Sequence, residues 1–132
     1  MRIGTLAATA GLSAKTIRFY EEAGLLAAPP RTPAGYRDYP AEAANRLAFI
    51  RDAAAAGLSL AEIRGVLAIR DTGQPPCQHV TTLIEAHLQR VEQRIAELLA
   101  TRVALQGLHQ RAQEVGPADC GPAEICRILS TA

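Results

Sequence analysis

Apolar residues recur at helical spacing over most of the chain, in stretches separated by glycine- and proline-containing turns. The pattern predicts helices over residues 3–10, 14–22, 41–56, 60–70 and 80–113. Ser13 is a suitable N-cap for the second helix, and Ser59 with Glu62 forms a capping-box pattern at the start of the fourth. Gly11 ends the first helix, and the turn of about three residues that follows it is typical of a helix-turn-helix.

The segment between the second and third predicted helices has a different composition. Pro29, Pro30 and Pro33 exclude a helix there, because proline lacks the amide donor that a helix interior needs. Gly35 followed by residues 36–39 predicts a turn that leads into a short strand. We therefore predict a β-hairpin here, which forms a wing beside the two short helices.

The last predicted helix carries a heptad pattern, in which apolar residues alternate at spacings of four and three. Its positions are Ile84, Leu88, Val91, Ile95, Leu98, Arg102, Leu105 and His109, with the arginine and the histidine interrupting the apolar seam. A helix of about 34 residues is about 50 Å long, and the chain has no second long helix to cover it. Because an exposed apolar seam is costly, a homodimer is favoured over a solvated single helix.

The predicted fold class is therefore mainly α, with four segments along the chain. A winged helix-turn-helix domain covers residues 1–70, and a linker that holds Cys77 and His79 covers residues 71–79. The dimerisation helix follows at 80–113, and residues 114–132 form a C-terminal cysteine-containing loop with one helical turn near residues 125–129.

The composition excludes several classes of protein. Of 132 residues, 48% are hydrophobic and 20% are charged, which is the balance of a soluble globular chain. No apolar run approaches the roughly 18–20 residues of a membrane span, and the first residues lack the apolar region of a signal peptide. We therefore expect a cytoplasmic protein without a membrane partner.

Charge is distributed unevenly, although the net charge is only +1. Residues 1–51 carry seven basic and four acidic side chains, which suits an anionic partner such as DNA. The candidate DNA-binding residues come from the second helix and the wing: Ser13, Lys15, Thr16, Arg18, Tyr20, Arg31, Tyr36 and Arg37. Taken singly, each of these residues could equally be an ordinary exposed polar residue. Tyr20 or Tyr39 could equally pack under the wing.

The chain has three cysteines, Cys77, Cys120 and Cys126, which is an odd count in a chain without a secretory signal. Metal binding or thiol chemistry is then favoured over a disulfide framework. Three thiolates suit the soft or borderline ions zinc, cadmium, lead, mercury and monovalent copper. His79 is the first candidate for a fourth ligand, and Asp119 and Glu124 are the next candidates.

Several motifs together resemble the MerR family of transcriptional regulators. They are Arg2-Ile3-Gly4 with Leu6-Ala7, Thr16-Ile17-Arg18-Phe19-Tyr20-Glu21, Gly24-Leu25-Leu26, Gly35-Tyr36-Arg37 with Tyr39, and Gly57-Leu58-Ser59-Leu60-Ala61-Glu62-Ile63. The resemblance implies a homodimer of winged helix-turn-helix protomers joined by an antiparallel coiled coil. It also implies a regulator that binds double-stranded promoter DNA and, on effector binding, distorts the promoter spacer so that RNA polymerase can engage it.

In an antiparallel dimer, the two ends of the long helix lie beside each other in different protomers. Residues 113–120 reach at most about 25 Å, so Cys77 cannot meet Cys120 across the helix of its own chain. Cys77 of one protomer could instead join Cys120 and Cys126 of the other. A cysteine at the position of Cys77 resembles the sensors of divalent metals, whereas the monovalent copper-group sensors have serine there. The resemblance thus implies activation of a metal resistance or efflux promoter by zinc, cadmium, lead or mercury.

The alternatives are a monovalent copper-group sensor or a thiol/redox-sensing regulator of the same family, which would use Cys120 and Cys126. The loop between these two cysteines is short, and it lacks the adjacent cysteine pair and the histidine of some zinc sensors. A drug-binding regulator would need a longer C-terminal segment. An enzyme is not expected, because no nucleophile–base pair, phosphate loop, carboxylate pair or Cys-x-x-Cys motif is present.

Overall fold

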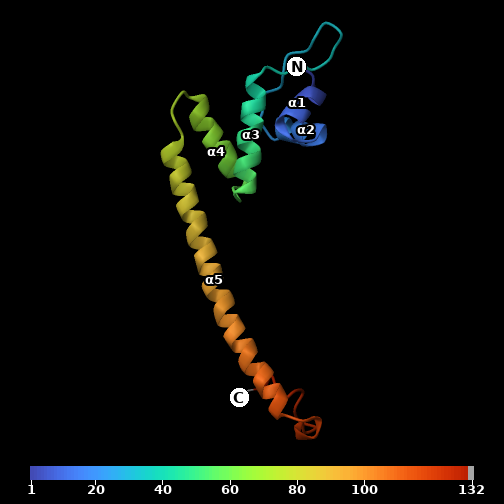
Figure 1. Ribbon diagram of the computed structural model, residues 1–132, viewed down its shortest axis with the longest axis vertical. Helices are drawn as coiled ribbons and strands as arrows, with labels where there is room; N and C mark the ends of the chain where they lie inside the picture. The colour runs from blue at the N-terminus through green and yellow to red at the C-terminus, as the bar shows by residue number, and fades with distance from the viewer. Residues whose placement is uncertain (131–132) are drawn as a thin grey trace. The chain divides into compact units, whose positions relative to one another are not determined.

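The computed structural model describes residues 1–130, which are mainly helical and contain no strand (Figure 1). The helices are α1 (Ile3–Ala10), α2 (Ala14–Glu22), α3 (Glu42–Ala55), α4 (Leu60–Asp71), α5 (Cys77–Glu114) and the 3-10 turn η1 (Pro117–Asp119). The chain forms two compact units, of which the first is Met1–Glu85 and the second begins at Ala86. The mainly α fold class is confirmed.

Helices α1 and α2 have the bounds that their sequence predicts. The Ser13 side chain accepts a hydrogen bond of 3.1 Å from the amide of Thr16, which satisfies one of the free donors at the start of α2. Gly11 ends α1 with a φ of 68°, a left-handed conformation that glycine adopts without steric cost. The predicted helix-turn-helix is therefore present.

The core of the first unit lies where α3 faces the other helices. Figure 1 shows α3 between α4 and the α1–α2 pair. The side chains that are almost fully buried there are Leu6, Ile17, Leu25, Tyr39, Leu47, Ile50, Ile63 and Val66. Most of these side chains lie on the inward faces of the four short helices, while Leu25 and Tyr39 come from the segment between α2 and α3, and their common burial explains why these elements fold as one unit.

Three arginines of α3 and α4 fasten the helix-turn-helix to the rest of this unit. Arg51 Nη1 donates to the carbonyl of Ala10 at 2.8 Å, and Arg64 Nη2 donates to the carbonyl of Ala23 at 2.7 Å. Both carbonyls lie at a helix C-terminus, where a cation is favourable. Arg46 Nε donates to the carbonyl of Leu25 at 2.7 Å, directly after the end of α2. These bonds fix the position of α2 against α3 and α4.

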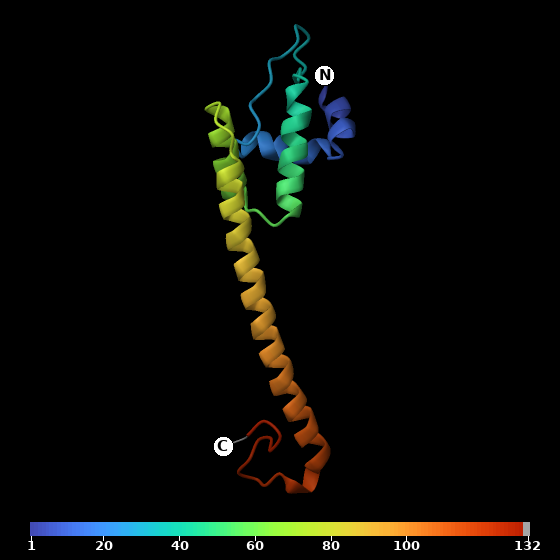
Figure 2. The same ribbon diagram turned by 60° about the vertical axis from the view of Figure 1, so that its left-hand side comes forward.

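The wing is present, but its predicted strand does not form. Residues 31 and 37 make one isolated antiparallel bridge, closed by the bonds Thr32 N to Tyr36 O and Asp38 N to Pro30 O. The ladder cannot continue to the next pairs, because Pro30 and Pro40 lack the amide donors that those pairs require. The wing is therefore a loop with a single bridge, and it projects past the start of α3 (Figures 1 and 2).

The connection between α4 and α5 is shorter than predicted. Helix α4 has the predicted capping box, and it ends at Asp71. Helix α5 begins at Cys77 rather than at residue 80, so the linker predicted over 71–79 is reduced to residues 72–76. Pro76 is the N-cap residue of α5, since its carbonyl accepts the amide of Val80 at 3.0 Å, and this position needs no amide donor.

The C-terminal segment of the second unit holds little regular structure. After α5, the chain forms η1, and the amide of Ser130 donates to the carbonyl of Cys126 at 3.0 Å. The helical turn predicted near residues 125–129 is therefore one hydrogen-bonded turn and not a helix. No helix formed by the described residues has the length and apolar content that crossing a bilayer requires.

Candidate nucleic-acid interface and cysteine sites

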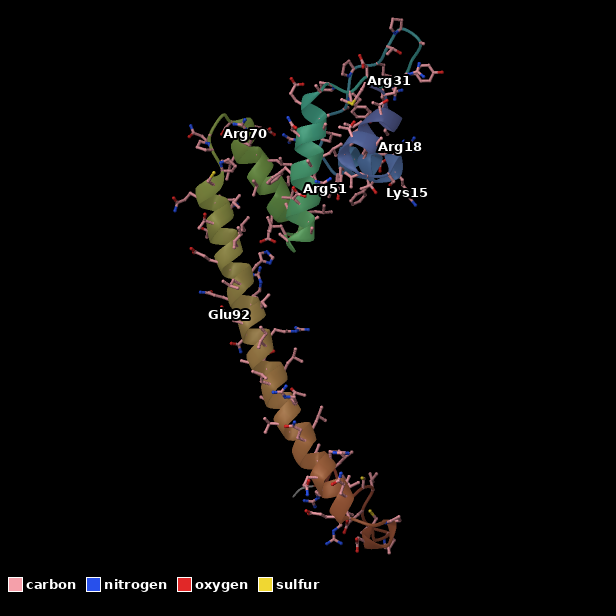
Figure 3. All side chains as sticks on the ribbon, in the orientation of Figure 1. Lys15, Arg18, Arg31, Arg51, Arg70 and Glu92 are labelled. Atoms are coloured by element: carbon pink, nitrogen blue, oxygen red, sulfur yellow. The ribbon has the colours of Figure 1, made fainter. Side chains whose placement is uncertain are left out.

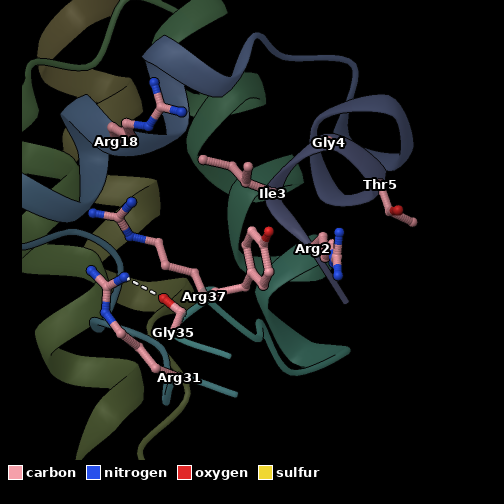
Figure 4. A pocket seen from close by; sticks show the side chains of 9 residues that line it. Arg2, Ile3, Gly4, Thr5, Arg18, Arg31, Gly35 and Arg37 are labelled. Atoms are coloured by element: carbon pink, nitrogen blue, oxygen red, sulfur yellow. Dashed lines mark hydrogen bonds between the residues drawn. The ribbon is translucent and has the colours of Figure 1, made fainter. Parts of the chain in front are cut away.

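A basic groove lies between the start of α1, helix α2 and the wing (Figure 4). Its lining consists of Arg2, Ile3, Gly4, Thr5, Arg18, Arg31, Gly35, Tyr36 and Arg37. Four arginines line this groove, and none of its lining residues is acidic. A groove with this charge is suited to a polyanion such as the DNA backbone.

Three of the groove arginines are held by specific contacts. Arg31 Nη1 donates to the carbonyl of Gly35 at 2.8 Å, across the turn of the wing (Figure 4). The Arg2 guanidinium lies over the ring of Tyr36, 4.3 Å from its centroid. Arg37 Nη2 lies 3.5 Å from a carboxylate oxygen of Glu21. The groove therefore presents guanidinium groups whose positions are set in advance, which lowers the cost of ordering them on a ligand.

Helix α2 presents two of the predicted DNA-binding residues to solvent. Lys15 and Arg18 are exposed, and Figure 3 shows them on the same side of the first unit as Arg31. Ser13 and Thr16 have a visible structural role, because their hydroxyl oxygens lie 2.8 Å apart at the N-cap of α2. Direct DNA contacts by these four residues stay predictions.

The structure corrects the expectation for Tyr20. Its side chain is only 9% exposed and belongs to the core of the first unit. Tyr20 follows Ile17 by three residues, so both lie on the face of α2 that packs inward. Phe19, with 48% of its surface exposed, occupies the outer side instead. In the wing, Arg31 and Tyr36 are exposed and Arg37 is half-buried, as a surface that meets a ligand requires.

Sequence reasoning missed two residues of this site. Arg2 joins the groove because the chain before α1 runs beside the wing, where the amide of Tyr39 donates to the carbonyl of Met1 at 2.7 Å. Glu21 links α2 to the wing, since it also accepts a hydrogen bond of 3.1 Å from the Tyr39 hydroxyl. Burial, followed by this hydrogen bond, raises the pKa of Tyr39 above its usual value. The one signal for Arg2 in the sequence was its place as a basic residue directly before an amphipathic helix.

The predicted seam of α5 lies on the surface of the second unit. Its large apolar side chains are about half exposed or more: Leu88, Val91, Ile95, Leu98 and Leu105. Ile84, at the end of the first unit, is exposed to the same degree. No residue between Ala86 and Ser130 is buried.

The three predicted metal ligands are free cysteines. Cys77 is exposed at the first position of α5, Cys120 is exposed after η1, and Cys126 is half-buried. Residues 1–130 of one chain contain no group of three or more His, Cys, Asp or Glu side chains that could hold a metal ion. The cysteines of one chain are therefore not gathered into a metal centre, and their role as ligands stays a prediction.

His79 lies on a different face of α5 from Cys77. Residues two apart on a helix do not face each other. The His79 imidazole lies instead beside α4, where its Nε2 is 3.8 Å from the position that a Cβ on Gly65 would take. The role of His79 as a fourth ligand stays a prediction.

Two family models match the chain. The model for "MerR HTH family regulatory protein" matches residues 1–68, and the model for "MerR, DNA binding" matches residues 44–108. Together they cover the groove, α3, α4 and most of α5.

Individual proteins match over most of the chain. The HTH-type transcriptional regulator ZntR of Escherichia coli K12 is 39% identical, over 97% of this chain and 89% of its own. The mercuric resistance operon regulatory protein of Bacillus cereus is 33% identical, over 86% of each. The crystal structure of the transcription regulator PbrR691 from Ralstonia metallidurans CH34, in complex with lead(II), is 38% identical, with a TM-score of 0.73 over 83% of this chain and 85% of that one. With the fold and the groove described above, these matches show that the chain belongs to the MerR family of helix-turn-helix regulatory proteins.

Proposed function

We propose that this chain is a metal-responsive transcriptional regulator, which activates a metal resistance or efflux promoter. The observation that carries the proposal is the set of three free cysteines, one at the start of α5 and two after its end, in a chain of a DNA-binding regulator family. Similar proteins support a metal effector, because one binds lead(II) and another regulates a mercuric resistance operon.

In this proposal, the basic groove binds double-stranded promoter DNA. Lys15, Thr16 and Arg18 at the exposed side of α2 would meet phosphates and base edges in the major groove. Arg31, Tyr36 and Arg37 of the wing, joined by Arg2, would bind flanking phosphates through guanidinium and phenol groups.

The protein would act as a homodimer. The exposed seam of α5 is a stripe of large apolar side chains at heptad spacing, which a second copy of the same helix would cover. An antiparallel arrangement of the two helices would bring Cys77 of one protomer to Cys120 and Cys126 of the partner subunit.

The donor set fits a soft or borderline divalent ion. Three cysteine thiolates are the ligands that zinc, cadmium, lead and mercury prefer, and the exposed positions of Cys77 and Cys120 leave their sulfur atoms accessible. A bound ion would supply sulfur–metal bonds that join the two protomers. We infer that the activated dimer bends and untwists the promoter spacer so that RNA polymerase engages both promoter elements. Such deformation costs roughly 1–10 kcal/mol, which protein–DNA contacts have to supply.

An anaerobic titration tests the metal proposal. The reduced protein would be titrated with cadmium, lead and mercury, while sulfur-to-metal charge-transfer absorbance is recorded, and zinc would be placed by competition. We expect saturation at one ion or more per protomer. Cys77→Ser, Cys120→Ser and Cys126→Ser should each abolish this signal and metal-dependent transcription, while operator affinity stays within a few-fold of the unsubstituted protein.

Two outcomes would contradict the proposal. Absence of tight binding by any of these ions would leave the DNA-binding unit without a metal effector. If transcription then responded to an oxidant, and Cys120→Ser removed the response, the regulator would be a thiol sensor. Loss of operator binding in the cysteine variants would contradict the separation of DNA binding from metal sensing.

A further inference from the structure

The segment after α5 holds two of the three cysteines, and its apolar side chains are at most half-buried. Residues 115–130 contain no buried side chain, and Ile125, beside Cys126, is fully exposed. A loop without buried apolar groups is held in place only by hydrogen bonds, and otherwise samples many conformations. The hydrogen bonds of this segment therefore decide where Cys120 and Cys126 lie.

Two arginines make the longest-range of these hydrogen bonds. Arg111, in the last turn of α5, donates through Nε to the carbonyl of Arg127 at 2.9 Å and through Nη2 to the carbonyl of Ser130 at 3.3 Å. Arg127 in turn donates through Nη1 to the carbonyl of Asp119 at 2.9 Å. The two guanidinium groups thus connect α5 to both ends of the loop that carries the cysteines.

The contact points lie directly next to the cysteines in the chain. The carbonyl of Asp119 shares a planar peptide unit with the nitrogen and Cα of Cys120, so fixing that carbonyl restricts the backbone of Cys120. Arg127 directly follows Cys126, and the carbonyl of Cys126 accepts the amide of Ser130 at 3.0 Å. The Asp119 carboxylate accepts a hydrogen bond of 2.8 Å from the amide of Gly116, and this bond stabilises the turn of residues 116–119.

We propose that Arg111 and Arg127 are positioning residues, which hold Cys120 and Cys126 in an arrangement ready for the ion; this inference rests on the proposed metal-sensing function. Neither arginine is a ligand, and each acts through backbone carbonyls of the loop. Arginine suits this role because its planar fork holds several donors in fixed directions, whereas lysine offers one flexible charged group.

The expected effect follows from the ordering of the loop. Without the arginine contacts, the ion has to order the loop as it binds, and the conformational entropy lost in that step weakens binding. Groups that orient ligands from outside the coordination shell typically change metal affinity by about 10- to 100-fold when they are removed.

The test compares Arg111→Lys and Arg127→Lys with Arg90→Lys, a matched change at an exposed arginine of the same helix. All three variants keep their charge, and helical circular dichroism would check folding. We expect about 10-fold weaker binding of cadmium for Arg111→Lys and Arg127→Lys, measured by competition with a chelator, and unchanged binding for Arg90→Lys. The charge-transfer absorbance at saturation should stay that of the unsubstituted protein, because the sulfur ligands are the same.

Hydrogen exchange of the metal-free protein gives a second readout. The amides of Gly116, Asp119 and Ser130 should exchange faster in Arg111→Lys and Arg127→Lys than in Arg90→Lys. Equal cadmium affinity in all variants, or unchanged exchange of the three amides, would overturn the positioning role while leaving the metal-sensing function intact. If the unsubstituted protein binds no cadmium, the proposed function itself is wrong, and the positioning role is overturned with it.

Discussion

The two units of this chain differ in how they treat their apolar side chains. The first unit buries a set of leucines and isoleucines together with Tyr39 in one core, and arginines from α3 and α4 close the ends of α1 and α2. The described part of the second unit buries none of its residues and exposes an apolar seam. The first unit can therefore fold on contacts within one chain, whereas the apolar seam of the second unit stays exposed in a single chain.

The aromatic residues make this comparison measurable. All three tyrosines, Tyr20, Tyr36 and Tyr39, lie in the first unit, and the chain has no tryptophan. Tyrosine fluorescence thus reports unfolding of the first unit alone, while helical circular dichroism also contains the signal of α5. Changes made in one unit can be followed separately from changes in the other.

The largest expected effect is loss of a core side chain in the first unit. Leu47 is fully buried on α3, so Leu47→Ala should lower the free energy of unfolding by about 2–5 kcal/mol through lost burial and the cavity left behind. Urea unfolding followed by tyrosine fluorescence measures this. The control Leu60→Ala, at a position that is 37% exposed, should cost less than about 1 kcal/mol. Equal costs for the two variants would contradict the core described here.

A charge in the α5 seam should weaken dimerisation and leave the stability of the first unit unchanged. Ile95 is 51% exposed in one chain, so Ile95→Glu should leave the tyrosine unfolding transition unchanged. In the proposed homodimer, the same change would bury two carboxylates, and the dimer dissociation constant should rise by at least about 100-fold. Sedimentation equilibrium measures this, with Ala96→Glu on the neighbouring outward position as the control. A dimer that withstands Ile95→Glu would show that the seam is not the interface.

Arg18 tests whether the groove of the first unit reads DNA independently of the second. Arg18→Ala should weaken operator binding by about 1–3 kcal/mol, which is roughly 5- to 150-fold, because an exposed guanidinium on α2 is lost. If Arg18 contacts a phosphate, the slope of log affinity against log salt should also fall by about 1. Metal uptake should stay unchanged.

Arg70→Ala, at the end of α4 and outside the groove lining, is the matched control for this measurement. It should bind the operator like the unsubstituted protein. Normal operator affinity in Arg18→Ala would remove Arg18 from the DNA-binding set.

Local signals predicted the helices well, because each helix carries its own start and stop. Ser13 caps α2, Ser59 and Glu62 form the capping box of α4, and Gly11 ends α1 in the conformation that only glycine adopts freely. Tertiary contacts between distant residues were not predictable in this way. The link from Glu21 to the wing and the place of Arg2 in the groove depend on how α2 and the wing pack, which no local spacing encodes.

Proline explains both errors in the predicted elements. A strand was predicted in the wing from Gly35 and the tyrosines after it, but the missing amide donors of Pro30 and Pro40 stop the ladder after one bridge. The start of α5 was predicted too late, because the loop was extended past Pro76, although Pro76 is the N-cap of the helix, a position that needs no amide donor. The candidate cysteines were visible from residue type alone, whereas the arginines that hold their loop became visible only in the fold.

The smallest expected effect concerns the ion pair between Arg46 and Asp71, which ties α3 to the end of α4. Arg46 donates to the two Asp71 carboxylate oxygens at 2.7 and 3.1 Å, and this hydrogen bonding lowers the pKa of Asp71. Because the pKa is lower in the folded chain, the pair stabilises the folded chain at pH values above the usual aspartate pKa. This stabilisation is lost as pH falls through the lowered value.

Asp71 is 56% exposed, so Asp71→Asn should cost only about 0.5–1 kcal/mol at pH 7. In urea unfolding series from pH 7 to pH 3, followed by tyrosine fluorescence, the difference from the unsubstituted protein should stay level down to about pH 5 and shrink below it. Asp52→Asn, at an exposed carboxylate paired only with its neighbour Arg51, should show a smaller cost at pH 7. A constant difference across the pH series would mean that the Asp71 side chain acts through packing and not through its charge.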